Sequence, residues 1–79
     1  MKARITVTLK NGVLDPQGRA IANALHSLGF GAVEDVRQGK LIEIQLKAAD
    51  ETSARGELEA MCRQLLANPV IENYRVELL

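Results

Sequence analysis

Two side chains in this 79-residue sequence could act as a nucleophile or a general base: the single cysteine, Cys62, and the single histidine, His26. A reactive thiol needs a neighbour that lowers its pKa, such as a helix N-terminus or a His. Cys62 has neither nearby and lies at helical spacing among apolar residues, so we interpret it as a core thiol. His26 has no Cys, Asp or second His beside it. We therefore expect no catalytic residue and no metal site in this chain.

A third candidate is the stretch 10–19, KNGVLDPQGR, because glycines before a helix can cradle a phosphate. Gly12 and Gly18 have neither Rossmann nor P-loop spacing, however, and no Lys-Ser/Thr pair follows them. Asp15 would also repel an anion. A structural role fits better, with Asp15 as the N-cap of a helix, Pro16 at its first position and Gly12 at positive φ. We predict a structural turn built on Gly12, Asp15 and Pro16, and no cofactor site.

The charge balance excludes several kinds of partner. Ten Lys and Arg residues balance ten Asp and Glu residues, so no strong field gathers nucleic acid or an anionic membrane. The only aromatic residues are Phe30 and Tyr74, too few for a sheet that stacks RNA bases.

No apolar run approaches about 18 residues, and no signal peptide opens the chain. We expect a cytoplasmic protein with no nucleic-acid or membrane partner, and its single cysteine fits a reducing compartment.

The length predicts one domain, residues 1–79, that folds only marginally alone. A chain of this size buries only about 60% of its unfolded surface. A net charge of zero gives little protection against self-association. We therefore expect a homodimer or a larger homo-oligomer.

The hydrophobic pattern predicts six elements. In chain order they are a strand over 1–10, a helix from Pro16 to Gly29, a hairpin of strands 32–37 and 40–47 around Gln38-Gly39, a helix from Asp50 to Asn68-Pro69, and a strand over 70–78. This βαββαβ order is typical of a ferredoxin-like α+β sandwich, with two helices on one face of a small antiparallel sheet.

Both predicted helices carry an apolar stripe that should face the sheet. The stripes are Ala20, Ile21, Ala24, Leu25 and Leu28 in the first helix, and Ala54, Leu58, Met61, Cys62 and Leu65 in the second. The other face of the sheet is predicted to carry Arg4, Thr6, Thr8, Leu41, Glu43, Gln45, Ile71, Asn73, Arg75 and Glu77. This mixture suits a hydrated protein–protein interface, although a plain solvated face is the simpler alternative.

Three polar residues are our candidates for contact with a partner. Arg37 and Lys40 flank the predicted hairpin turn, where side chains project freely, and Asn68 lies in the connection before Pro69. A solvated hairpin tip and a helix stop would explain the same residues.

Three stretches together resemble one known family. They are 7–18 (VTLKNGVLDPQG), 36–40 (VRQGK) and 65–74 (LLANPVIENY). In this order and spacing they are similar to the PurS family, the small subunits of phosphoribosylformylglycinamidine (FGAM) synthase. The similarity runs from end to end of the chain.

The resemblance implies a role in de novo purine synthesis. The assembled enzyme of this family converts formylglycinamide ribonucleotide, glutamine, ATP and water into FGAM, glutamate, ADP and phosphate. A glutaminase subunit releases ammonia, and a large synthetase subunit uses ATP and Mg²⁺. The small subunit, as a homodimer, is expected to help hold these two partners together and to help seal the ammonia path. No catalytic residue carries over from the family to this chain.

Two other classes remain open on the sequence. A ligand-sensing module of the ACT type shares the βαββαβ order, and amino-acid binding by the isolated chain would favour it. A small independent enzyme is the third reading, and turnover without partners would establish it.

Overall fold

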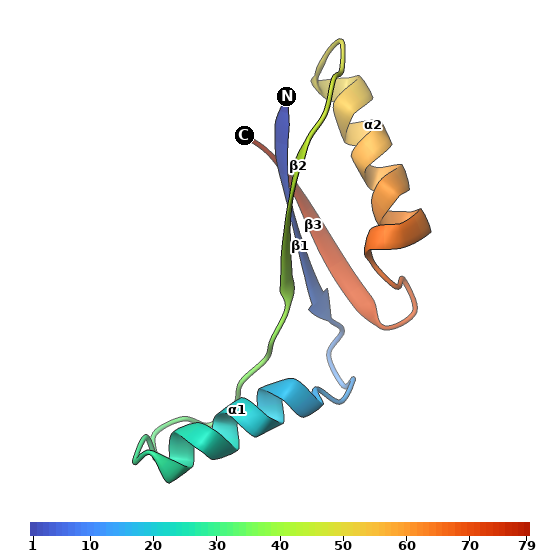
Figure 1. Ribbon diagram of the computed structural model, residues 1–79. Helices are drawn as coiled ribbons and strands as arrows, with labels where there is room; N and C mark the ends of the chain where they lie inside the picture. The colour runs from blue at the N-terminus through green and yellow to red at the C-terminus, as the bar shows by residue number, and fades with distance from the viewer.

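The computed structural model describes all 79 residues and contains one three-stranded sheet with two helices (Figure 1). The strands are β1 (Lys2–Leu9), β2 (Lys40–Gln45) and β3 (Glu72–Leu78), in the antiparallel order β2-β1-β3. The helices are α1 (Pro16–Ser27) and α2 (Glu51–Met61), and a π-helical turn, η1 (Cys62–Leu66), continues α2. The predicted α+β class, with an antiparallel sheet and two helices, is confirmed.

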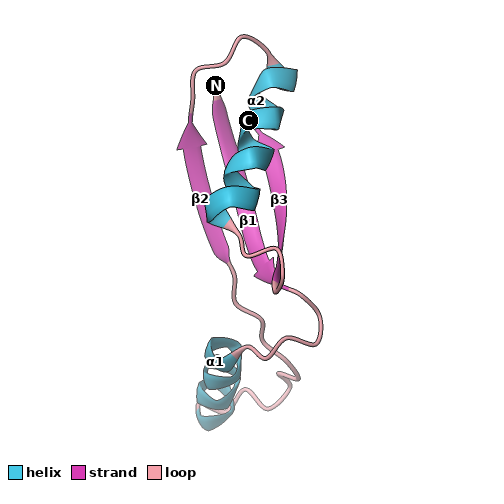
Figure 2. Ribbon diagram, turned by 90° about the vertical axis from the view of Figure 1, so that its right-hand side faces the viewer, coloured by secondary structure: helices cyan, strands magenta, loops and turns pink.

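The core lies between the central strand and α2. Ala3, Ile5 and Val7 of β1 point to the face that α2 covers and are 0–1% exposed, as the alternation of this strand predicts. Leu58 and Cys62 meet them from the helix and are fully buried. Figure 2 shows α2 lying in front of this face of the sheet.

The predicted stripe of the second helix is wrong at one position. Leu65 is 82% exposed, whereas Leu66 and Ala67 pack against the core instead. The reason is η1, in which the N–H of Ala67 donates to the carbonyl of Cys62, five residues back, at 3.0 Å. A π turn holds more residues than an α turn, so every side chain after it is rotated away from its α-helical position.

The predicted strand over 32–37 is absent, and the chain does not reverse at Gln38-Gly39. The segment 32–38 instead runs back along α1 and then leads directly into β2 (Figure 1). Two of its backbone groups are bound by α1 and its N-cap: Asp15 accepts from the N–H of Gln38, and His26 donates to the carbonyl of Val33. The segment is not part of the three-stranded sheet.

The expectation that both helices cover the sheet is wrong for α1. This helix projects from one end of the sheet and lies away from it in both views (Figures 1 and 2). The molecule is accordingly elongated, 51 × 25 × 14 Å, with a radius of gyration of 16.1 Å. A compact chain of this length would have a radius of gyration of about 12 Å. We call α1 with the segment 28–38 the arm.

Candidate interaction surfaces

The turn that joins β1 to the arm has the predicted geometry. Gly12 has φ +84°, and the N–H of Val13 donates to the carbonyl of Lys10 at 3.1 Å. Pro16 occupies the first turn of α1, and Asp15 is its N-cap. One carboxylate oxygen of Asp15 accepts from the N–H of Gly18 at 2.9 Å, satisfying a donor that the helix itself leaves free.

The second oxygen of Asp15 has a role that the sequence did not predict. It accepts from the N–H of Gln38 at 2.8 Å and so joins the two chain segments that enter and leave the arm. Asp15 is only 8% exposed. The hydrogen bond from Gln38, followed by the one from Gly18, lowers the pKa of Asp15 below its ordinary value of 3.8. The carboxylate therefore stays ionised while it holds these two chain segments together.

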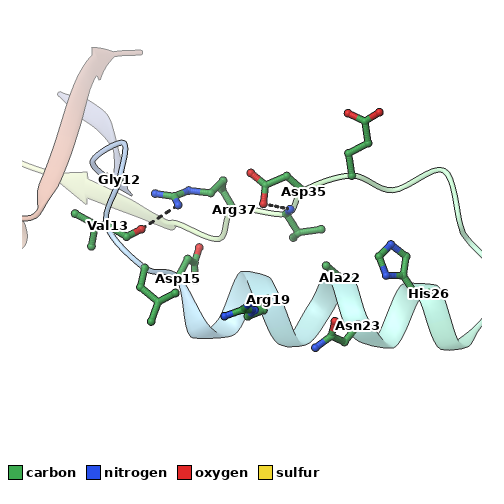
Figure 3. A pocket seen from close by; sticks show the side chains of 12 residues that line it. Gly12, Val13, Asp15, Arg19, Ala22, Asn23, His26, Asp35 and Arg37 are labelled. Atoms are coloured by element: carbon green, nitrogen blue, oxygen red, sulfur yellow. Dashed lines mark hydrogen bonds between the residues drawn. The ribbon is translucent and has the colours of Figure 1, made fainter.

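Arg37 makes a second set of hydrogen bonds between the same two chain segments (Figure 3). Its guanidinium donates to the carbonyls of Val13 and Lys10, each at 3.0 Å, and more weakly to that of Leu9 at 3.4 Å. These carbonyls belong to the end of β1 and the turn after it, so the prediction that the side chain of Arg37 projects freely is wrong. That prediction depended on a hairpin around Gln38-Gly39, and the structure has no such hairpin.

The three candidate partner-contact residues lie at one end of the sheet, the end from which the arm leaves. Lys40 begins β2 opposite Val7, and Asn68 lies in the turn before β3. The side-chain oxygen of Asn68 accepts from the N–H of Val70 at 3.0 Å, within that turn. Contact of Arg37, Lys40 and Asn68 with a partner stays a prediction.

A groove of about 540 Å³ runs between α1 and the returning segment of the arm. Figure 3 shows Arg19, Asn23 and His26 on the helix side and Asp35 on the other. The Nε2 of His26 donates to the carbonyl of Val33 at 2.7 Å, which fastens the returning segment to the helix. His26 therefore has a structural contact rather than a catalytic partner.

The other candidate nucleophile, Cys62, lies in the core between α2 and the sheet. Cys62 is fully buried, and this burial, together with the charge of Glu59, raises the pKa of its thiol. A thiol in such surroundings is a poor nucleophile. No three His, Cys, Asp or Glu side chains are grouped closely enough to hold a metal ion.

The exposed apolar residues form the main feature that the sequence did not predict. Ile21 and Leu28 of the α1 stripe are 39% and 74% exposed because the helix does not reach the sheet. Leu14 and Phe30, at the two ends of the same helix, are 68% and 57% exposed. The sequence signal for this surface was the presence of apolar residues, Leu14 and Phe30, just beyond the two ends of an amphipathic helix. Exposed apolar surface of this kind usually marks an interaction site.

The face of the sheet opposite α2 is polar, as predicted. It carries a Lys2–Glu43 ion pair at 3.6 Å and an Arg75–Glu77 ion pair at 3.0 Å. Arg4 lies between the two glutamates in register, and its Nε is buried without a hydrogen-bond partner. Leu41 on the same face is 60% exposed. Neither helix has the length and apolar character needed to cross a membrane.

The family model for PurS, phosphoribosylformylglycinamidine (FGAM) synthase, matches residues 2–79. The chain belongs to the PurS family. A PurS subunit of FGAM synthase from Synechocystis is 53% identical over 95% of this chain and 75% of its own length. The PurS subunit from Methanocaldococcus jannaschii is 45% identical over 96% of this chain and 92% of its own.

Solved PurS structures have the same fold. The crystal structure of Methanocaldococcus jannaschii PurS superposes with a TM-score of 0.86 over 96% of this chain and 92% of that one. A chain in the PurLQS structure from Thermotoga maritima, 33% identical, superposes with a TM-score of 0.89 over 99% of this chain and 95% of that one. The PurS relationship predicted from the three motifs is thus confirmed, and it covers the arm as well as the sheet.

Proposed function

We propose that this chain is a non-catalytic assembly subunit of a cytoplasmic FGAM synthase in purine biosynthesis. The observation that carries the proposal is the contrast between a small core and a large exposed apolar surface. Only seven hydrophobic residues are buried, whereas ten large ones are exposed. A chain that leaves so much apolar surface in water is built to be covered by other subunits.

The partners in this proposal are the large synthetase subunit and the glutaminase subunit. The PurLQS structure from Thermotoga maritima supports it, because a chain of that assembly has the fold of this one. ATP and Mg²⁺ would bind to the large subunit, and this chain would bind no cofactor. The buried thiol of Cys62 and the occupied ring of His26 agree with a role outside the chemistry. The role includes helping to seal the path of ammonia between the two partners.

Self-association belongs to the same proposal. The surface area of the chain is 5731 Å², whereas a compact protein of 8.6 kDa exposes about 4,700 Å². The excess, about 1,000 Å², is close to the roughly 800 Å² that each partner contributes to an interface of standard size. We propose that at least two copies associate.

Reconstitution from separately purified subunits tests the assembly role. With glutamine as the nitrogen donor, omission of this chain should abolish FGAM formation. With an ammonium salt as donor, the synthetase subunit should keep its activity without this chain, because no transfer between subunits is needed. Equal loss with both donors would instead show that this chain takes part in the synthetase reaction and would contradict the proposal.

A further inference from the structure

The connection that leads from the end of α2 into β3 leaves its large apolar side chains in water (Figure 1). Leu65 is 82% exposed, Val70 is 78% exposed and Ile71 is 39% exposed. We call residues 65–71 the 65–71 loop. Large apolar side chains that are exposed together within one short segment mark an interaction site.

The polar groups of this loop hold its shape. The side-chain oxygen of Asn68 accepts from the N–H of Val70 at 3.0 Å, and the carboxylate of Glu72 accepts from the N–H of Asn68 at 2.7 Å. The carbonyl of Asn68 accepts from the N–H groups of Ile71 and Glu72 at 3.2 and 2.7 Å. Pro69 fixes its own φ within the same turn. A loop that is already held in one conformation loses little entropy when it binds a partner.

The exposure of Leu65 is a consequence of the π turn. In an uninterrupted α-helix Leu65, three residues after Cys62, would lie on the side of the buried Leu58 and Cys62. The turn η1 instead places Leu66 and Ala67 against the core and leaves Leu65 in water. Single π turns within helices occur frequently at functional sites. This turn therefore displays a large apolar side chain that regular helical geometry would bury.

The charges beside the loop are positive. The N–H of Lys10 donates to the carbonyl of Ile71 at 2.8 Å, so this lysine lies next to the loop. Arg63 precedes Leu65 by two residues, and neither cation takes part in an ion pair. The carboxylate of Glu72 already accepts a hydrogen bond within the turn. The complementary surface is therefore an apolar hollow with carboxylates at its rim.

A second copy of this chain does not supply such a hollow. Its two larger grooves, of about 540 and 210 Å³, are lined mainly by polar residues. We infer that the 65–71 loop is a preformed docking loop, which seats Leu65 and Val70 in an apolar, acid-rimmed hollow on a different subunit of FGAM synthase. The inference rests on the assembly role proposed above and assigns that role to particular side chains.

Titration of the chain into fixed amounts of the synthetase and glutaminase subunits tests the docking role. Glutamine-dependent FGAM formation gives two readouts, the chain concentration at half-maximal turnover and the maximal turnover. Leu65→Ser and Val70→Ser should each raise the half-saturating concentration about tenfold. Maximal turnover and melting temperature should stay as in wild type, because both side chains are exposed in the free chain. Leu79→Ser is the matched control, since Leu79 is 57% exposed at the opposite end of the sheet.

Four outcomes would overturn the inference. The first is an unchanged half-saturating concentration for both loop variants, and the second is an equal increase for Leu79→Ser. The third is a loss of maximal turnover that excess chain does not restore, because it would place the loop in the chemistry. The fourth is sedimentation of the isolated loop variants as smaller species than wild type, because the loop would then join copies of this chain. If wild type itself does not support glutamine-dependent turnover, the proposed function fails instead.

Deletion of Leu65 separates its display from the packing of the core. Without this residue Leu66 follows Cys62 at a spacing of three, which keeps two side chains on one face of an α-helix. The shortened chain should therefore melt no lower than wild type, yet it should require the same raised concentration in the titration as Leu65→Ser. A lower melting temperature would show that the π turn serves core packing and would contradict the display of Leu65.

Charge reversal tests the acidic rim of the hollow. Lys10→Glu should raise the half-saturating concentration, and added salt should weaken assembly of this variant less than assembly of wild type. Lys47→Glu is the matched control, because Lys47 is an exposed lysine at the other end of the sheet, and it should titrate like wild type. Equal curves for Lys10→Glu and Lys47→Glu would contradict an acid-rimmed hollow at this loop.

Discussion

The carboxylate of Asp15 accepts a hydrogen bond at 2.8 Å from the backbone N–H of Gln38, 23 positions further along the chain. Its other oxygen caps α1 through Gly18. A single side chain thus fixes the start of the helix relative to the segment that returns from it. This relationship sets the direction in which the arm leaves the sheet.

Asp15→Asn should reduce the acid sensitivity of the fold. The pKa of Asp15 is lowered in the folded state, so its contribution to stability is complete above the ordinary value of 3.8 and is lost as the pH falls through the folded-state pKa. Wild type should therefore lose melting temperature below about pH 4 more steeply than the variant, which starts from a lower value at neutral pH. Glu57→Gln, at an exposed position on α2, is the control and should follow the wild-type curve. Parallel curves for wild type and Asp15→Asn would contradict this role.

Gly18→Ala and Gly56→Ala should change stability in opposite directions, although both positions are helical. A Cβ at Gly18 would clash with the backbone carbonyl oxygen of Val36, so the arm must open to admit it. A Cβ at Gly56 meets nothing within 4 Å, and Ala there should stabilise the helix by about 1 kcal/mol. Denaturant unfolding of both variants measures the difference. Equal effects would mean that the returning segment does not pack on α1.

Charge reversal at Arg37 and Lys40 should have different consequences. Arg37→Glu removes three hydrogen bonds to the turn, so it should lower the melting temperature as well as weaken assembly. Lys40→Glu alters an exposed side chain at the start of β2, and should weaken binding to the partner subunits with little change in melting temperature. Thermal melts and pull-down with the synthetase and glutaminase subunits check both. Unchanged affinity of Lys40→Glu would remove this residue from the contact surface.

Cys62→Ser and His26→Gln should each leave turnover of the reconstituted complex within a few-fold of wild type. Loss of a true general base or nucleophile lowers turnover by about 10²-fold or more. This chain must be present in excess in the assay, so that weaker assembly is not mistaken for lost chemistry. A loss of several hundredfold that excess chain does not restore would place a catalytic residue here.

The isolated chain should sediment as a dimer or a larger species at micromolar concentration. The physical reasons are its exposed apolar stripe on α1 and its net charge of zero. Sedimentation velocity over a range of concentrations measures the mass directly. A single species of 8.6 kDa throughout would contradict self-association.

Local features were readable from the sequence because they depend on residues a few positions apart. The alternation of Ala3, Ile5 and Val7 predicts a strand with one buried face, and these three residues are buried. Asp15 and Pro16 predict the start of α1 because a cap acts on the N–H groups of the first turn. The three motifs that indicated the PurS family also lie within such local stretches.

Tertiary structure decided where these elements lie relative to one another. The segment 32–37 has the apolar residues of a strand. It is held beside α1 by the hydrogen bond from His26 to the carbonyl of Val33 and by the one from the next residue, Gln38, to Asp15. The stripe of α1 predicts a buried face without specifying which sheet, or which copy of the chain, covers it. One π turn was enough to expose Leu65. Helical spacing does not predict such a turn, because it assumes 3.6 residues per turn throughout.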